Sequence, residues 1–205
     1  MSDTKFAMER YHARYDNKQY QAVTQKLADV LHVERDSPTA SDIANLVTDA
    51  ALGLCGHPSY TNGWRVLAVF CGQQRIPADM VDALHTYLSL YAQNGDTAVD
   101  DFAATVKALT LSYTALDALQ SAVPHANGIH GWQGRAAYQL LATSDYLVQA
   151  AIQLLGNGDE SYISEKLHHG LQRLTGALQE AVRHSPRPDR FDFSETVFPS
   201  NHGER

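Results

Sequence analysis

Residues 97–123 read TAVDDFAATVKALTLSYTALDALQSAV, and this stretch decides the fold. Its large apolar side chains recur at alternating steps of three and four residues: Val99, Phe102, Val106, Leu109, Tyr113 and Leu116. That spacing places them on one stripe of an α-helix. A turn with a capping residue, Asn94-Gly95-Asp96, precedes the stretch, and Pro124 follows it. Because proline disfavours a continuing helix, we predict that this helix ends at Pro124.

Helical patterns continue on both sides of this stretch. Apolar side chains nearly encircle residues 133–155, which is typical of a central helix that others surround. The segment 159–183 carries a single apolar face, formed by Ile163, Leu167, Leu171, Leu174, Leu178 and Ala181. Further helices are predicted upstream at 5–15, 18–33, 41–54 and 78–91. The VLAVF core of residues 65–71 also suits a strand, but no second strand exists to pair with it, so we predict a helix there.

These segments predict an all-α fold, a single-domain bundle of about six to eight helices with an antiparallel core. Residues 1–184 are expected to form the bundle domain. Residues 185–205 contain three prolines and no periodicity, so we predict an irregular C-terminal tail. The phenylalanines of that tail are candidate anchors against the bundle or a partner: Phe191, Phe193 and Phe198.

Charge and composition exclude several function classes. The chain has 205 residues and a net charge of -7, and residues 37–184 carry seven basic against thirteen acidic side chains. That sign repels phosphate, so neither nucleic acid nor an anionic membrane is an expected partner. Cys55 and Cys71 form no CxxC pair, and the N-terminus lacks the apolar run of a signal peptide. A soluble, cytoplasmic protein is therefore expected.

Two helical segments carry a carboxylate and a histidine three residues apart, Asp82 with His85 and Glu165 with His168. Dinuclear metal bundles use this spacing, but the helical phase turns both carboxylates away from the apolar stripes. We predict exposed pairs that share no metal. Asp145 is either a buried carboxylate or part of a narrow solvent stripe with Gln149 and Gln153, and the solvent stripe is favoured.

Two loops of similar composition are the candidate site. Residues 56–65 read GHPSYTNGWR and residues 124–135 read PHANGIHGWQGR, so each holds histidine, an Asn-Gly turn, a Gly-Trp pair and then an arginine. If both loops lie at one end of the bundle, they form a small-molecule pocket with apolar walls and one cationic anchor. That pocket would contain His57, Trp64, His130, Trp132 and Arg135. The alternative is that each tryptophan plugs its own end of the core.

For function, the leading hypothesis is a non-enzymatic binding protein that docks a protein partner or encloses a small ligand. The first alternative is a haem- or metal-dependent helical enzyme or carrier that uses the loop histidines His57, His125 and His130. A ligand-responsive transcription regulator is disfavoured, because the would-be recognition helix from Ala78 contains no arginine or lysine. No cofactor, ligand or oligomeric state follows from the sequence.

Overall fold

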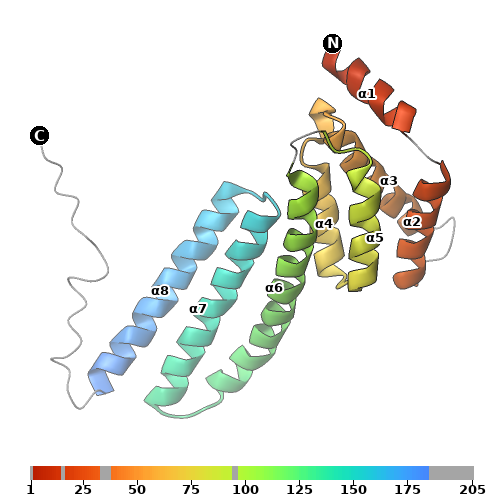
Figure 1. Ribbon diagram of the computed structural model, residues 1–205. Coiled ribbons are helices and arrows are strands. Elements are labelled where there is room, and N and C mark those ends of the chain that lie inside the picture. The colour runs from red at the N-terminus through yellow and green to blue at the C-terminus, as the bar shows by residue number, and fades with distance from the viewer. Residues whose placement is uncertain (1, 15–16, 33–37, 94–96, 185–205) are drawn as a thin grey trace, which may run out of the picture. The chain divides into compact units, whose positions relative to one another are not determined.

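The computed structural model describes residues 2–14, 17–32, 38–93 and 97–184, and the all-α prediction is confirmed (Figure 1). Within these residues every regular element is a helix: α1 (Ser2–Arg14), α2 (Asn17–Val30), α3 (Pro38–Leu54), η1 (Pro58–Tyr60), α4 (Gly63–Gln73), α5 (Ala78–Ser89), α6 (Ala98–Asn127), α7 (Trp132–Leu155) and α8 (Glu160–His184). In this described part of the chain, no helix is long and apolar enough to cross a membrane.

Most helix boundaries agree with the sequence pattern. The ambiguous VLAVF segment lies inside α4, where Leu67, Ala68 and Cys71 are buried. The Asp159 carboxylate accepts a hydrogen bond from the Ser161 amide and so caps α8 at the start of the predicted segment 159–183. The turn predicted at residues 94–96 and the tail at 185–205, with Phe191, Phe193 and Phe198, lie outside the described residues.

The predicted end of α6 at Pro124 is wrong, because the helix continues to Asn127. Proline removes one backbone donor, and the carbonyl that loses its partner belongs to Gln120. Gln120 and Pro124 are both exposed, so water can bind that carbonyl instead. A proline on the solvent side of the last turn is therefore compatible with the helix.

The chain packs as two compact units. Of the described residues, the first unit contains those of 2–117 and 148–164, and the second contains 118–147 and 165–184. The helices α6, α7 and α8 each contribute residues to both units.

The first unit has a conventional core of large apolar side chains. The predicted stripe of α6 points into it, since Val99, Phe102, Val106 and Leu109 are buried. The largest fully buried side chains come from α2 to α6 and the turn after α5: Tyr91, Phe102, Leu27, Ile43, Leu54, Leu67, Met80, Leu84, Leu88, Leu109, Val47 and Val106. Burying that much apolar surface accounts for the stability of this unit.

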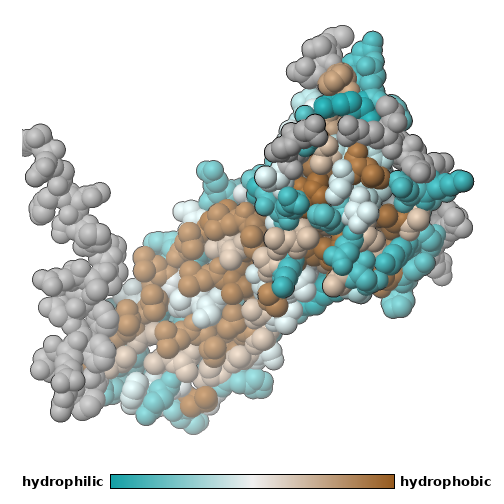
Figure 2. Space-filling model, in the orientation of Figure 1, coloured by the Kyte–Doolittle hydropathy of each residue, from teal (hydrophilic) through white to brown (hydrophobic). Residues whose placement is uncertain are grey.

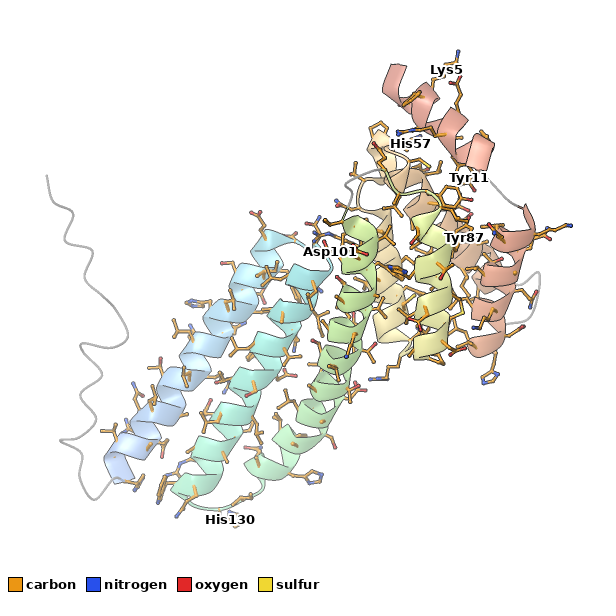
Figure 3. All side chains as sticks on the ribbon, in the orientation of Figure 1. Lys5, Tyr11, His57, Tyr87, Asp101 and His130 are labelled. Atoms are coloured by element: carbon orange, nitrogen blue, oxygen red, sulfur yellow. The ribbon has the colours of Figure 1, made fainter. Side chains whose placement is uncertain are left out.

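A cluster of tyrosines joins the first two helices to this core. The ring of Tyr11 stacks on Tyr91 with 5.6 Å between centroids, and Tyr91 lies 5.2 Å from Tyr87. Tyr20 of α2 lies 6.4 Å from Tyr87. Figure 3 labels Tyr11 on α1 and Tyr87 on α5. Burial raises the pKa of the Tyr87 phenol well above its usual range, so Tyr87 is a neutral packing group in this cluster.

Among the described residues of the second unit, the buried ones are all small. Its buried residues are Ala126, Gly134, Ala136, Ala142, Thr143, Gly170 and Ala177. The Thr143 hydroxyl is 3.4 Å from the Gly170 carbonyl oxygen, and Arg173 donates to the Gln139 side chain at 3.2 Å. Thr143 contacts Gly170, and the earlier residue Gln139 contacts the later residue Arg173. The two helices therefore pack antiparallel. Small residues at the contact line let the backbones approach closely, and they leave the larger side chains outside.

Candidate functional site

The first Gly-Trp loop folds back on α3 and contains the short helix η1. The backbone N–H of Ser59 donates to Nδ1 of His57 at 3.2 Å, which caps η1. The His57 ring is 4.8 Å from that of Tyr60 and is only 8% exposed. Because Nδ1 accepts a hydrogen bond, the neutral ring carries its proton on Nε2. His57 therefore fixes the conformation of the loop.

Two glycines permit this loop to lie against α3. A Cβ atom at Gly53 would overlap the Tyr60 carbonyl oxygen, and one at Gly63 would overlap the Asp49 carbonyl oxygen. Only glycine has no Cβ, so both contacts require it. The Asn-Gly pair thus marks a close approach between α3 and the start of α4.

A small depression of about 190 Å³ lies between this loop and α3. Asp49 provides a carboxylate there, Ser59 and Thr61 contribute further lining, and Leu46 and Val66 provide apolar walls. Burial raises the pKa of Asp49, and an electrostatic effect of the nearby His57 ring opposes part of that rise. The depression presents one acid and no cationic anchor.

Trp64 belongs to the core of the first unit. It is 8% exposed and packs within the main apolar cluster. The Arg65 guanidinium lies 4.9 Å from the centre of its ring. These contacts agree with the alternative that this tryptophan plugs the core.

The second Gly-Trp loop is a tight turn from α6 into α7. Gly131 has φ of +94°, a backbone conformation that favours glycine. Trp132 is half-buried and stacks on His184 of α8, with 5.4 Å between ring centres and 12° between planes. His130 is exposed in the connection between α6 and α7 (Figure 3). Trp132 therefore joins the first residue of α7 to the last residue of α8.

Arg135 of α7 already has an acidic partner. Its Nε and Nη2 donate to Oε2 of Glu180 at 3.3 and 3.2 Å. Arg183 and His184 each lie 3.7 Å from the same carboxylate. A cleft of about 310 Å³ beside this cluster is lined by Gln139 as well as by Arg135, Glu180 and Arg183. Arg135, the predicted cationic anchor, thus lies in an ion-pair cluster with Glu180.

The five residues predicted to form one pocket are divided between the two units. His57 and Trp64 belong to the first, and His130, Trp132 and Arg135 belong to the second. Within the second unit, Trp132 and Arg135 both contact the last turns of α8. Convergence of the two loops on one ligand stays a prediction.

The carboxylate–histidine pairs lie on the surface. Asp82 and Glu165 are exposed, as the helical phase predicted. Glu165 is 3.7 Å from His169, and His168 contacts Gln172 instead. Across the described residues, no three histidine, cysteine or acidic side chains are grouped so as to hold a metal ion.

A surface of exposed leucines on the second unit is a feature that the sequence analysis missed. It consists of Leu140 and Leu147 on α7, exposed by 47% and 46%, and Leu167 and Leu171 on α8, each exposed by 45%. We call these four residues the leucine face. Figure 2 shows hydrophobic side chains gathered over α7 and α8. The prediction that other helices surround α7 is wrong for this stripe.

The helical phase explains why the leucines are exposed. At about 100° per residue, the leucines of α8 centre roughly 80° from the line through Gly170 and Ala177, where α8 meets α7. On α7, Leu140 and Leu147 lie at a similar angle around the helix axis from the contact residues Gln139 and Thr143. The direction of rotation is the same as on α8. In an antiparallel pair, equal offsets put both sets of leucines on the same side.

Leu147 connects the two halves of this face. A Cβ atom at Gly170 would lie 3.5 Å from Cδ2 of Leu147, so the leucine lies against the α8 backbone between Leu167 and Leu171. The face is therefore continuous from one helix to the other.

The residues expected to be the solvent stripe of α7 lie on its opposite side. Asp145, Gln149 and Gln153 are half-buried, whereas the exposed stripe contains Leu140 and Leu147. The polar and apolar sides of α7 are thus reversed relative to the prediction. One signal could have located the leucine face: small residues, Gly170 and Ala177, recur beside the leucine stripe of α8 and mark a different contact line.

No protein-family model, curated protein or solved structure matches this chain. The functional inference therefore depends on the geometry of these sites alone.

Proposed function

We propose that this chain is a non-enzymatic interaction protein that docks a protein through the leucine face of its second unit. The observation that carries the proposal is the exposure of four leucines, two from each of two adjacent helices, on one continuous surface. Contiguous apolar surface on a folded protein marks an interaction site, since it is unfavourable to leave it in water.

The chemistry of the leucine face suits a protein surface better than a small ligand. The exposed stripe of α7 contains Gln133, Leu140, Ser144 and Leu147, none of which carries a charge. Such a surface buries apolar area against another apolar surface and forms few directional contacts. A small ligand needs a concave site with placed polar groups. Two adjacent helices with leucines on one side instead match the way helices dock on helices.

The depressions of the described residues give less support to a small-ligand function. A wide one of about 450 Å³ is lined by Trp64 and by two side chains of opposite charge, Arg65 and Asp101. The one beside Asp49 is about 190 Å³ and has a single acid. In the cleft beside Arg135, the guanidinium is paired with Glu180. A ligand entering that cleft would have to compete with an existing ion pair.

Partner capture with matched variants tests the proposal. The immobilised chain is incubated with extract of its native host, and retained proteins are quantified for the wild type, Leu147→Glu/Leu171→Glu and Leu111→Glu. Leu111 is a suitable control because it is 63% exposed on α6, in the first unit and outside the leucine face. We expect saturable capture of a protein by the wild type and the Leu111 variant only. Identical capture by all three would contradict the proposal.

A further inference from the structure

We infer that the occupant of the leucine face is a second copy of this chain, which rests on the docking function proposed above. Two copies would meet through the same surface, related by a two-fold axis. Each copy would supply α7 and α8, so that the paired faces form a closed helical core that neither copy has alone.

The charge of the second unit favours self-association. The whole chain has a net charge of -7, which opposes contact between two copies. In the described residues of the second unit, however, four basic side chains (Arg135, Lys166, Arg173 and Arg183) accompany three acidic ones (Asp145, Glu165 and Glu180). The acidic surplus therefore lies elsewhere, and two second units, each with one more basic than acidic side chain among these residues, can approach with little repulsion.

The leucine face is self-complementary because it is uncharged. A partner of strong opposite charge would be matched by charged side chains within the face, and the four leucines supply none. On α8 the neighbouring acid Glu165 lies about 160° around the helix from Leu167. When the leucine faces of two copies meet, no like charges lie opposite one another. The same patch can therefore serve both sides of an isologous interface.

The α7–α8 surface that carries the leucine face has a size of the order that a dimer needs. The second unit contains residues 132–147 of α7 and 165–184 of α8. With a rise of about 1.5 Å per residue and about 10 Å between axes, the pair covers roughly 500 Å² in projection. Accessible surface exceeds its projection, and a standard interface buries about 800 Å² per partner. The α7–α8 surface is therefore large enough to form most of one half of an interface.

The small side chains in the interior of the second unit give an independent reason for a second copy to cover the leucine face. The buried side chains of this unit are no larger than threonine, while its leucines are exposed or half-buried. A second copy covers the leucines of both chains at once, so each gains the large-side-chain core that the small residues do not provide.

Molar mass by light scattering tests the inference on the full-length chain between about 1 and 100 μM, a range chosen to span common dimer affinities. We expect twice the chain mass of 22.6 kDa for the wild type and for Leu111→Glu. Leu147→Glu and Leu171→Glu, made separately, are expected to give monomers with unchanged helical circular dichroism. Two independent variants protect the test against one that fails to fold.

Three results would overturn the inference. A wild-type monomer at every concentration excludes the second copy. A wild-type dimer that both leucine variants leave intact places the interface elsewhere. A wild-type monomer that dimerises only when Phe191, Phe193 and Phe198 are changed to serine assigns the face to the chain's own C-terminal segment. The docking function fails separately, if leucine-dependent capture from the host extract is also absent.

Discussion

At the residue scale, the two tryptophans look alike in sequence and differ in environment. Each follows a glycine in a histidine-containing loop, which led to one hypothesis for both. Trp64 is buried in the core of the first unit, whereas Trp132 is half-buried and stacks on one histidine. Sequence identifies a Gly-Trp turn in each case, but the depth of the indole depends on contacts with distant residues.

This difference predicts unequal effects of removing the two indoles. Trp64→Ala should lower the free energy of unfolding by about 3 to 5 kcal/mol, because it leaves a cavity in a packed core. Trp132→Ala should lower it by about 1 kcal/mol, the order of a single aromatic contact. Urea denaturation of both variants measures the two values. Equal losses would show that Trp132 is also part of a core.

Asp49 predicts a pH dependence with a definite sign. Burial raises the pKa of Asp49 in the folded state, so the folded chain binds this proton more tightly than the unfolded chain. The stability that it contributes is full below the usual pKa and is lost as pH rises through the raised pKa. Asp49→Asn cannot ionise. We therefore expect it to be more stable than the wild type at neutral pH, with a gain that shrinks toward pH 4.

Asp79 provides the control of opposite sign. Its carboxylate is 2.9 Å from Nζ of Lys26, and a hydrogen bond and charge from that lysine lower the pKa of Asp79. Its stabilising effect is present above the usual pKa and is lost on acidification. Asp79→Asn should therefore be less stable than the wild type at neutral pH. If both variants shift stability in the same direction across a pH series, the assignment for Asp49 is wrong.

At the scale of the elements, the glycines of the two loops differ in whether a larger residue can replace them. Gly63→Ala should lower the free energy of unfolding by about 1 to 3 kcal/mol, since its Cβ would overlap the backbone of Asp49. In the second loop, Gly128→Ala meets only the His125 carbonyl oxygen at 3.4 Å and should change stability by less than about 0.5 kcal/mol. Thermal or urea unfolding of both variants provides the comparison. A tolerated alanine at Gly63 would contradict the close approach of α3 and α4.

The helices themselves were largely predictable from the sequence, for local reasons. The stripe of α6 repeats at helical spacing and is buried over Val99, Phe102, Val106 and Leu109. The end of α6 was not predictable from Pro124, because whether a proline ends a helix depends on solvent access to one carbonyl. Periodicity thus predicts that a helix exists, but the residue at which it ends depends on the surroundings of its last turn.

The direction in which an apolar stripe faces was the least predictable property. The leucines of α8 form the clearest stripe of that helix, and the sequence analysis placed them inside. The contact with α7 instead follows Gly170 and Ala177, where close backbone approach is possible. A stripe identifies a surface that needs covering, and the sequence of one chain does not say which chain covers it.

At the scale of the whole molecule, the two units differ in how they are stabilised. The first has a core of large side chains, and the second has a small-residue interior and the exposed leucine face. If a second copy covers this face, the stability of the second unit depends on protein concentration, whereas that of the first does not. Self-association would then complete the fold of the second unit.

The most direct test of this account is whether water reaches the leucine methyl groups in solution. Methyl NMR of the full-length chain with a water-soluble paramagnetic agent measures that access residue by residue. The account predicts that at about 100 μM, a concentration above common dimer affinities, Leu147 and Leu171 relax far less than the exposed Leu111. Leu140→Glu should remove their protection. Relaxation of Leu147 and Leu171 equal to that of Leu111 at every concentration would contradict it.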